Sequence, residues 1–393
     1  MMRRQQRGYS LIELMIATSL AVITGMVTLQ VAANFQARRV ITSGNNEAVV
    51  SVAVGLSSIE RELRMAGAGL IGSSGLQCKN GVNIAYKNVT VRNGEPLQLV
   101  AIVDGGTGPD TVQYIRSDAS QKSNTGGPLY IIDTMGSPDA ALHVERDDGL
   151  ITGDLYLAGS ADGNKLCTLY QMSDPPLVYD TVVKLLHSPG NAYGYNPDTT
   201  AVFTDPMSYD TSDQVINLGP QPILAFSIAC KNGPVVQGNF SPGGGGGSSA
   251  GTADKAASNC DLVRYAPIEE SPAIGTGRSV ASQIIDLQAQ YGIAPTGSQS
   301  ITEWVDATGA TWIKPSNDDF KRVKAIRIAL VARGEYDAAL VSPEKLVLWK
   351  DPPTGQVLTE SKLEKTLSTE ERHYRYQVLS TVVPLVNVIR GGL

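Results

Sequence analysis

The sequence predicts an α+β protein, in which one long N-terminal helix packs on a large, mainly antiparallel β-rich globular domain. An apolar pattern with helical spacing extends through the first 66 residues. Beyond it, short runs rich in β-branched and aromatic residues alternate with Gly, Pro, Asn and Asp. The chain has 40 glycines in 393 residues, roughly a tenth against a usual ~7%. Glycine disfavours helix interiors, so this excess favours strands and turns after the first segment.

The first segment has the charge order of a membrane anchor. Arg3, Arg4 and Arg7 precede an apolar run whose only charge is Glu13. The 24 residues from Leu14 to Ala37 are uncharged, and as a helix they would extend roughly 36 Å. That length crosses a bilayer core of about 30 Å and exceeds the apolar core of an ordinary secretory signal. We therefore expect the first half of the helix to span a membrane.

The helical pattern continues past the membrane-spanning half. Apolar residues recur at spacings of three and four over Val49, Val52, Leu56, Ile59, Leu63 and Ala66. Arg61, Glu62 and Arg64 lie off this stripe. The pattern predicts one helix from about Ser10 to Ala66 whose second half packs on the body. Gly44-Asn45-Asn46 and Gly25 are weak points, because these residue types disfavour helix interiors.

Glu13 requires an explanation, because a charge in lipid costs about 2.5 kcal/mol or more. The surrounding sequence, "RGYSLIELMIA", resembles the type III signal of type IV pilins and pseudopilins. The resemblance implies cleavage by a prepilin peptidase after Gly8 and methylation of the new amine on Tyr9, where Phe is more usual. It also implies that Glu13 pairs with the N-terminal amine of a neighbouring subunit, which would neutralise two groups that are each costly in lipid. The alternative is a Glu that reaches the headgroups from a simple single-span anchor.

The remaining chain divides into predicted strands and one low-complexity segment. The predicted strands before the final third are Val82–Val91, Leu97–Gly105, Asp110–Ser117, Leu129–Thr134, Gly153–Gly159, Pro222–Cys230 and Asp261–Ile268. Between the last two lies 231–259, which contains "SPGGGGGSSAGTA" and is predicted to be a disordered surface loop. A tolerated insertion is the simplest explanation of this loop, and a flexible contact loop is the alternative. The domain organisation is therefore a leader (1–8), a transmembrane and stem helix (9–66) and a body (67–393).

Four cysteines, Cys78, Cys167, Cys230 and Cys260, lack the CxxC spacing of metal sites. In an exported chain an even number favours disulfides, with three connectivities. We favour Cys230–Cys260, which bracket the Gly-rich loop, and this leaves Cys78–Cys167. Free buried thiols are the alternative.

The final third is more regular. Ser282–Ile293 is expected to be a strand or short helix, and Asp318–Tyr336 a helical turn followed by a half-exposed strand centred on 323–331. His373–Ile389 is expected to be a strand that Pro384 interrupts, which is typical of an edge or a bulge. This order, with Trp304 and Trp312 between the first two and "LSTVVPLVNVI" at the end, resembles the C-terminal half of large minor pilins of the PilW type.

Motifs of catalysis or metal binding are absent from the sequence. It contains no HExxH, G-x-S-x-G or Walker A motif. His143, His187 and His373 are far apart in the sequence, "ERDDG" (145–149) lacks the ligand spacing of an EF-hand, and "KRVK" (321–324) is too short to indicate a DNA-binding face. We expect no enzymatic activity, no cofactor and no metal. The formal net charge of −6 also disfavours nucleic acid as a partner.

These observations and the resemblance together predict a minor type IV pilin that primes pilus assembly in the tip complex. The implied partners are other minor and major pilins through the stem, the prepilin peptidase, the inner-membrane assembly platform and a tip adhesin. The chain would first lie in the bacterial inner membrane with its body in the periplasm, and then in the pilus at the cell surface. The main alternative is a minor pseudopilin of a type II secretion system, which shares the stem. A membrane-anchored periplasmic enzyme and a competence pilus subunit that contacts DNA are further alternatives.

Overall fold

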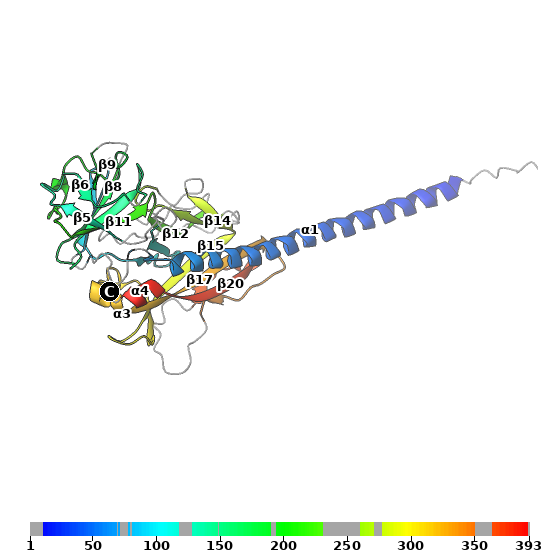
Figure 1. The fold of residues 1–393 in the computed structure, drawn as a ribbon. Coiled ribbons are helices and arrows are strands. Elements are labelled where there is room, and N and C mark those ends of the chain that lie inside the picture. The colour runs from blue at the N-terminus through cyan, green and yellow to red at the C-terminus, as the bar shows by residue number, and fades with distance from the viewer. Residues whose placement is uncertain are drawn as a thin grey trace, which may run out of the picture.

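The protein consists of a long helix, α1, that projects from one end of a β-rich body (Figure 1). The structure is a computed structural model, and it describes residues 11–68, 70, 78, 81–117, 128–147, 149–189, 194–230, 260–270, 277–349 and 364–391. The strand pairs are antiparallel with one exception, in which β1 and β8 run parallel. The predicted α+β class is confirmed.

Helix α1 is continuous from Leu11 to Arg64, over 54 residues. It passes through Gly44–Asn46 and Gly25 without a break. Its first part extends away from the body, and its last third lies along the body (Figure 1). The prediction of one long helix is therefore confirmed for the residues that the structure describes.

Two sheets lie next to α1. The five-stranded sheet has the order β14-β13-β12-β4-β3, and the four-stranded sheet the order β16-β15-β17-β20. The first contains β3 (Val100–Val103), β4 (Thr111–Ile115), β12 (Ile223–Cys230), β13 (Cys260–Tyr265) and β14 (Arg278–Ser282). The second contains β15 (Ile284–Ile293), β16 (Glu303–Val305), β17 (Val323–Tyr336) and β20 (Tyr374–Pro384). One continuous apolar core joins the two sheets to α1.

The sheets next to α1 carry short accessory elements. Two short helices precede β17, the strands β18 and β19 form a separate two-stranded sheet, and a short helix ends the described chain. These elements are α2 (Gly309–Trp312), α3 (Asn317–Arg322), β18 (Lys345–Val347), β19 (Glu364–Thr366), the 3-10 turn η4 (Glu371–His373) and α4 (Val386–Gly391).

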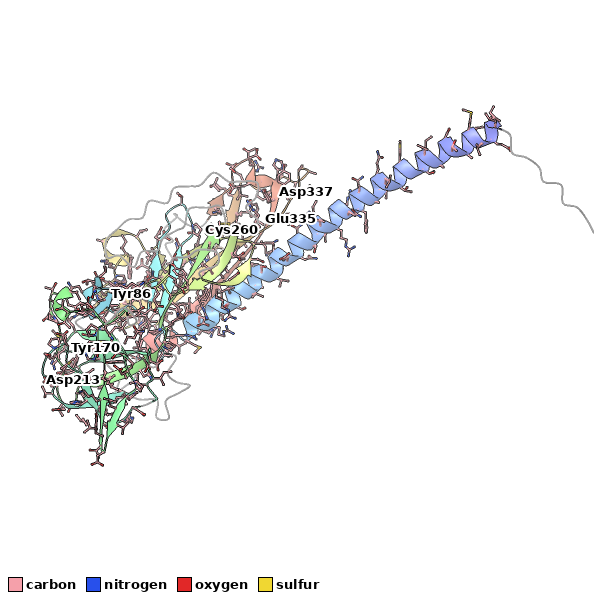
Figure 2. All side chains as sticks on the ribbon, turned by 90° about the horizontal axis from the view of Figure 1, so that it is seen from above. Tyr86, Tyr170, Asp213, Cys260, Glu335 and Asp337 are labelled. Carbon is pink, nitrogen blue, oxygen red and sulfur yellow. A yellow bond between two sulfur atoms is a disulfide. The ribbon has the colours of Figure 1, made fainter. Side chains whose placement is uncertain are left out.

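A third, nine-stranded sheet has the order β2-β1-β8-β7-β11-β5-β6-β10-β9. Part of it forms a lobe beyond the C-terminal end of α1 (Figure 1), and a second apolar core lies within the lobe. The elements are β1 (Val82–Tyr86), β2 (Val89–Glu95), β5 (Leu129–Asp133), β6 (Leu142–Val144), β7 (Leu155–Gly159), β8 (Cys167–Gln171), β9 (Leu177–Tyr179), β10 (Val182–Leu185), the 3-10 turn η2 (Thr200–Val202) and β11 (Gln214–Gly219). Figure 2 shows Tyr170 and Asp213 in this lobe, whereas Glu335 and Asp337 lie where the projecting part of α1 leaves the body.

Two strand predictions were wrong in detail. The run Val82–Val91 is a hairpin and not one strand, because Lys87 and Asn88 both adopt positive φ and form a two-residue turn between the paired Tyr86 and Val89. The predicted strand His373–Ile389 ends at Pro384 and continues as α4. The expectation that Pro384 marks an edge strand is confirmed, since β20 is the edge of its sheet.

The expectation of a half-exposed strand at 323–331 was also wrong. Helix α1 covers one face of β17, and an apolar cluster that includes Leu346 and Trp349 covers the other. Arg327 lies within this second layer, with its guanidinium 5.0 Å from the Trp304 ring centroid and 4.4 Å from that of Trp349. Its Nε donates to the Gln290 side-chain oxygen at 2.6 Å. Burial lowers the pKa of Arg327 to about 10. An arginine in the alternating pattern of this strand therefore does not indicate a solvent-exposed face.

Candidate functional site: the stem–body junction

The projecting part of α1 meets the criteria for a membrane span. In the part of the chain that the structure describes, α1 is the one helix long and apolar enough to cross a bilayer by length and composition, and its apolar window has no contact with the body. A signal sequence passes the same test. Glu13 lies exposed in the first turn of this helix. Gly8 and Tyr9, the predicted cleavage and methylation positions, lie outside the described residues.

The stem–body junction, which we define as residues 44–66 and the strands that they contact, begins at Gly44. A side chain at Gly44 would clash with Glu335, and a side chain at Gly334 would clash with the Asn45 amide. The helix and the end of β17 therefore approach more closely here than larger residues would permit. This contact explains why the predicted weak point stays helical, since packing on the body outweighs local propensity.

The buried face of α1 follows the predicted stripe closely. Its buried apolar residues are Ala48, Val52, Leu56, Ile59 and Leu63, and Ala66 in the turn that follows the helix is buried as well. Val49 was predicted to belong to this face but is 47% exposed, and Ala48 takes its place. At Gly55 an added Cβ would lie 3.1 Å from Leu262 and 3.2 Å from Leu330, so this glycine sets the distance between helix and sheets.

Glu62 is the main functional candidate that sequence analysis missed. It was placed off the apolar stripe, yet it is only 3% exposed. Arg264 Nη1 lies 3.0 Å from its Oε1, and Arg116 Nη1 lies 3.0 Å from its Oε2. The Tyr114 hydroxyl donates to Oε2 at 3.2 Å. One carboxylate on the stem therefore joins the ends of β4 and β13.

The chemistry of this cluster explains its position. Burial and the neighbouring Glu62 carboxylate raise the pKa of the Tyr114 hydroxyl, which stays a neutral donor. A buried carboxylate with one arginine would be weakly compensated, whereas two arginines and a hydroxyl satisfy several of its lone pairs. Because the contacts of Glu62 have a defined geometry, they fix the rotation of α1 about its axis and its position along the body. The sequence contains one signal of this position, because Glu62 follows the stripe residue Ile59 by three residues, and residues with this spacing lie on the same face of a helix.

The end of the stem is held by segments far away in the sequence. The Asn387 side chain in α4 donates to the Ala66 carbonyl at 2.8 Å. The Gly67 N–H donates to Ile115 O at 2.7 Å. The turn that follows α1 is thus held by the C-terminal helix, and the chain that leaves this turn pairs with the end of β4.

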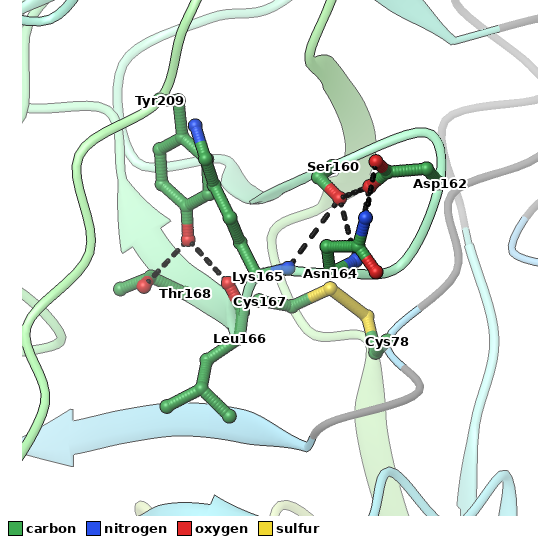
Figure 3. Close-up of a disulfide and its surroundings, with 9 residues drawn as sticks. All are labelled: Cys78, Ser160, Asp162, Asn164, Lys165, Leu166, Cys167, Thr168 and Tyr209. Atoms are coloured by element: carbon green, nitrogen blue, oxygen red, sulfur yellow. Dashed lines mark hydrogen bonds between the residues drawn. A yellow bond between two sulfur atoms is a disulfide. The ribbon is translucent and has the colours of Figure 1, made fainter.

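Both favoured disulfides are present. Cys78–Cys167 joins the segment after the stem to the start of β8 (Figure 3), and Cys230–Cys260 joins β12 to β13 at directly opposed positions. No free cysteine occurs among the described residues. The first disulfide connects the lobe to the stem, and the second closes the strand pair that carries Arg264. The Gly-rich loop between Cys230 and Cys260 lies outside the described residues.

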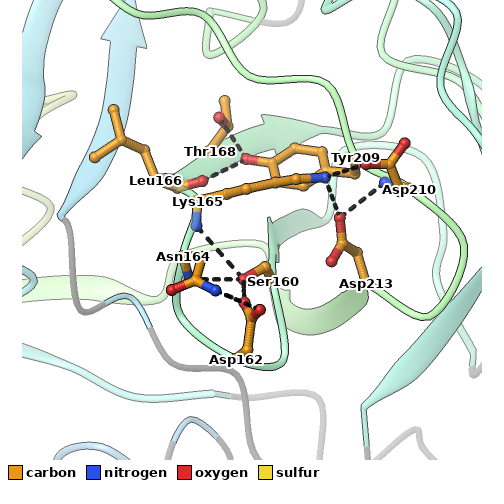
Figure 4. A network of polar contacts seen from close by, with 9 residues as sticks. All are labelled: Ser160, Asp162, Asn164, Lys165, Leu166, Thr168, Tyr209, Asp210 and Asp213. Carbon is orange, nitrogen blue, oxygen red and sulfur yellow. Dashed lines mark hydrogen bonds and ion pairs between the residues drawn. The ribbon is translucent and has the colours of Figure 1, made fainter.

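A polar network lies beside the first disulfide (Figure 3), and Figure 4 shows its contacts. Lys165 Nζ lies 2.8 Å from Asp210 and 2.7 Å from Asp213, and Tyr209 donates to Thr168 Oγ1 at 2.8 Å. Burial lowers the pKa of Lys165, but the two carboxylates outweigh it and raise this pKa overall. The network fastens the loop before β11 to the start of β8. It is structural and lies in the lobe, away from the stem.

The three histidines lie apart in the fold. His143 contacts Asp133, His373 contacts the Leu340 carbonyl, and His187 lies buried beside Tyr156. Across the described ranges no group of three or more His, Cys, Asp or Glu side chains is placed to hold a metal. In the predicted "KRVK" cluster, Lys321 pairs with Asp318 at 3.0 Å. The stem–body junction is therefore the strongest candidate site on the described chain.

Residues 253–387 match the family model described as Type IV Pilus-assembly protein W. No curated protein and no solved structure matches the chain. The matched segment includes β13, β14, β15, β17 and β20. These strands hold α1 in the stem–body junction, whereas the lobe lies outside the match. The match supports a protein that takes part in type IV pilus assembly. The unburied apolar part of α1, which lies outside the match, has the length and composition of a membrane anchor.

Proposed function

We propose that this chain is a minor type IV pilin, a non-enzymatic structural subunit that primes pilus assembly and lies in the tip complex. One observation carries the proposal: the segment that matches a pilus-assembly family is part of the body that holds a helix whose N-terminal part is apolar and unburied. A helix of this kind anchors the subunit in the membrane before assembly. Afterwards its apolar surface is buried against neighbouring stems.

The proposal gives the predicted signal residues their roles. Prepilin peptidase cleaves after Gly8, Tyr9 is methylated, and the Glu13 carboxylate pairs with the terminal amine of the next subunit. The lobe supports a place at the tip, because a large domain beyond the end of the stem would crowd a repeating lattice. The assembly platform, other pilins and a tip adhesin are the partners.

The first test is mass spectrometry of filaments sheared from the cell surface. A peptide that begins at methylated Tyr9 in this fraction is the expected result. The same peptide found in the membrane fraction alone would favour a type II secretion pseudopilin. An unprocessed start at Met1 would contradict the proposal and leave a simple membrane anchor. Immunogold labelling spread evenly along the filament would contradict the tip location.

The role of Glu13 is tested with a matched control on the same helix. Glu13→Gln removes the carboxylate from the apolar part, and Glu47→Gln removes an exposed carboxylate next to the body. We expect both variants to be processed and membrane-bound, and Glu13→Gln alone to be lost from sheared filaments. Equal amounts of the two variants in filaments would contradict the assigned role.

A further inference from the structure

Strand β20 is the longest open strand edge in the described chain. It extends over eleven residues and forms the outer edge of the four-stranded sheet, where it pairs with β17 alone. Its side chains alternate between the α1 side, with Leu379 and Val383 in the main core, and the opposite side. Its free edge is thus available to hydrogen-bond a further strand.

The hydrogen bond just beyond the end of β20 shows which of its residues direct their backbone groups toward β17 and which direct them outward. The Leu385 N–H donates to the Lys324 carbonyl at 2.9 Å, one residue beyond the Ala325–Pro384 pair. Hydrogen-bonded and non-hydrogen-bonded pairs alternate in an antiparallel ladder, so even-numbered residues direct their backbone groups outward. The outward N–H groups belong to Tyr376, Val378, Ser380 and Val382. Within the described ranges, none of the four has a hydrogen-bond acceptor.

This edge lacks most of the features that prevent strand addition in soluble proteins. Natural edges are kept short or carry Lys, Pro or bulges. Strand β20 has no Lys, its proline is its last residue, and its register shift lies before Tyr376. Arg375 is its one charged residue, and Val382 is 49% exposed. Another β-strand can form hydrogen bonds with such a row of unpaired backbone groups, which repeat at every second residue.

We propose that β20 receives an edge strand from a different subunit of the same assembly, running antiparallel to β20, which is the more stable and more frequent pairing of β-strands. The inference rests on the proposed function, because that function places all stems in one membrane. Strand β20 runs in the same direction as α1, since its start lies near Asn45 and its end is followed by Asn387, which contacts Ala66. Antiparallel pairing of two β20 edges would reverse one stem, so a second copy of this chain does not fit.

The exposed flank of α1 beside β20 supports the same partner. Ser51 contacts Ser282, and Gly55 lies against Ala281, so one flank of the helix faces β14. Helical geometry places Val49 on the opposite flank, which lies toward β20. Val49 is 47% exposed. A neighbouring stem that packs along this flank would hold its own body, and one edge strand of that body, next to β20.

Photo-crosslinking in the full-length chain, expressed in its own cells, tests the proposal. The probe is p-benzoylphenylalanine in place of Val382, with Val178 at the edge of the lobe as the control position. We expect the probe at 382 to crosslink to an edge strand of a non-identical subunit that carries a pilin-type stem. Crosslinks at 382 to a second copy of β20, or to no strand edge, would overturn it.

A proline substitution separates backbone pairing from simple proximity. Ser380→Pro removes one outward N–H and no β17 hydrogen bond, whereas Ser380→Thr keeps the N–H. We expect Ser380→Pro to lower the crosslink from residue 382 by about tenfold, since it leaves a partner carbonyl unpaired. The intact disulfides and an unchanged melting temperature report correct folding. Equal crosslinking in the two variants would overturn the proposal, even where the Tyr9 peptide in filaments upholds the proposed function.

Discussion

At the scale of single residues, a buried carboxylate on the stem and a buried imidazole in the lobe have the strongest consequences. Glu62 lies between Arg116 and Arg264, and its removal leaves two guanidinium groups without their shared anion. His187 is buried with its Nδ1 2.8 Å from the Tyr156 hydroxyl. Each gives a measurable stability effect with a defined sign.

The first prediction concerns Glu62→Gln. We expect the free energy of unfolding to fall by about 3 kcal/mol, because breaking a buried ion pair leaves uncompensated charge. Denaturant unfolding of the detergent-solubilised chain, followed by tryptophan fluorescence, measures it. The control is Glu60→Gln, two residues earlier on the same helix, whose exposed pair with Arg64 contributes about 0.5 kcal/mol or less. Equal losses in both variants would contradict the assigned role of Glu62.

The second prediction concerns pH. Burial lowers the pKa of His187 to about 4, below the ordinary value of about 6.5. The folded state therefore keeps the imidazole neutral, and stability that is complete above pH 6.5 is lost as pH falls through 4. The expected loss from this group is about 3 kcal/mol. His187→Gln should show a shallower decline in stability between pH 6.5 and 4, and parallel pH profiles would contradict the prediction.

At the scale of elements, the stem has two apolar surfaces with different partners. One is buried on the body through residues such as Ile59, which is fully buried. The other includes Val50, which is 61% exposed although it lies in the same part of the helix. The first surface stabilises the subunit, and the second is available to other stems.

The third prediction separates these two surfaces. Ile59→Ala should lower the free energy of unfolding by about 3 kcal/mol, because it removes buried methyl groups and leaves a cavity. Val50→Ala should change it by about 0.5 kcal/mol or less. The same denaturant titration measures both. A large loss in Val50→Ala would show that this surface already has a partner within the subunit.

At the scale of the whole molecule, the lobe and the stem are connected through the Cys78–Cys167 disulfide and the loops beside it. The bond spans 89 residues of sequence and joins the segment after α1 to the nine-stranded sheet. Closing a loop of this length restricts the unfolded chain, which favours the folded state. The lobe therefore depends on oxidation more strongly than its apolar core alone suggests.

The fourth prediction follows from this connection. Replacing Cys78 and Cys167 together with Ser should lower the free energy of unfolding by about 4.6 kcal/mol, against roughly 3.6 kcal/mol for the Cys230 and Cys260 pair, which closes a shorter loop. Unfolding of the two double variants with and without reductant measures the difference. If reductant destabilises neither the wild type nor either variant, the disulfides do not form in the protein.

The sequence alone determined the long N-terminal helix, its apolar stripe, the β-rich body and the favoured disulfides. Each depends on local periodicity, composition or position along the chain, which the residues carry without reference to their neighbours in space. Glu62, the burial of Arg327 and the helical Gly44–Asn46 segment required the tertiary structure. For Glu62 and for Asn45, a residue more than 100 positions away provides the partner that reverses the local preference, Arg264 for the first and Gly334 for the second. Arg327 is covered by Trp304 and Trp349, which come from other strands and loops of the body. Pro384 indicated an edge or a bulge in this strand, but strand order was needed to show that β20 is an open edge, because an edge is defined by what does not lie beside it.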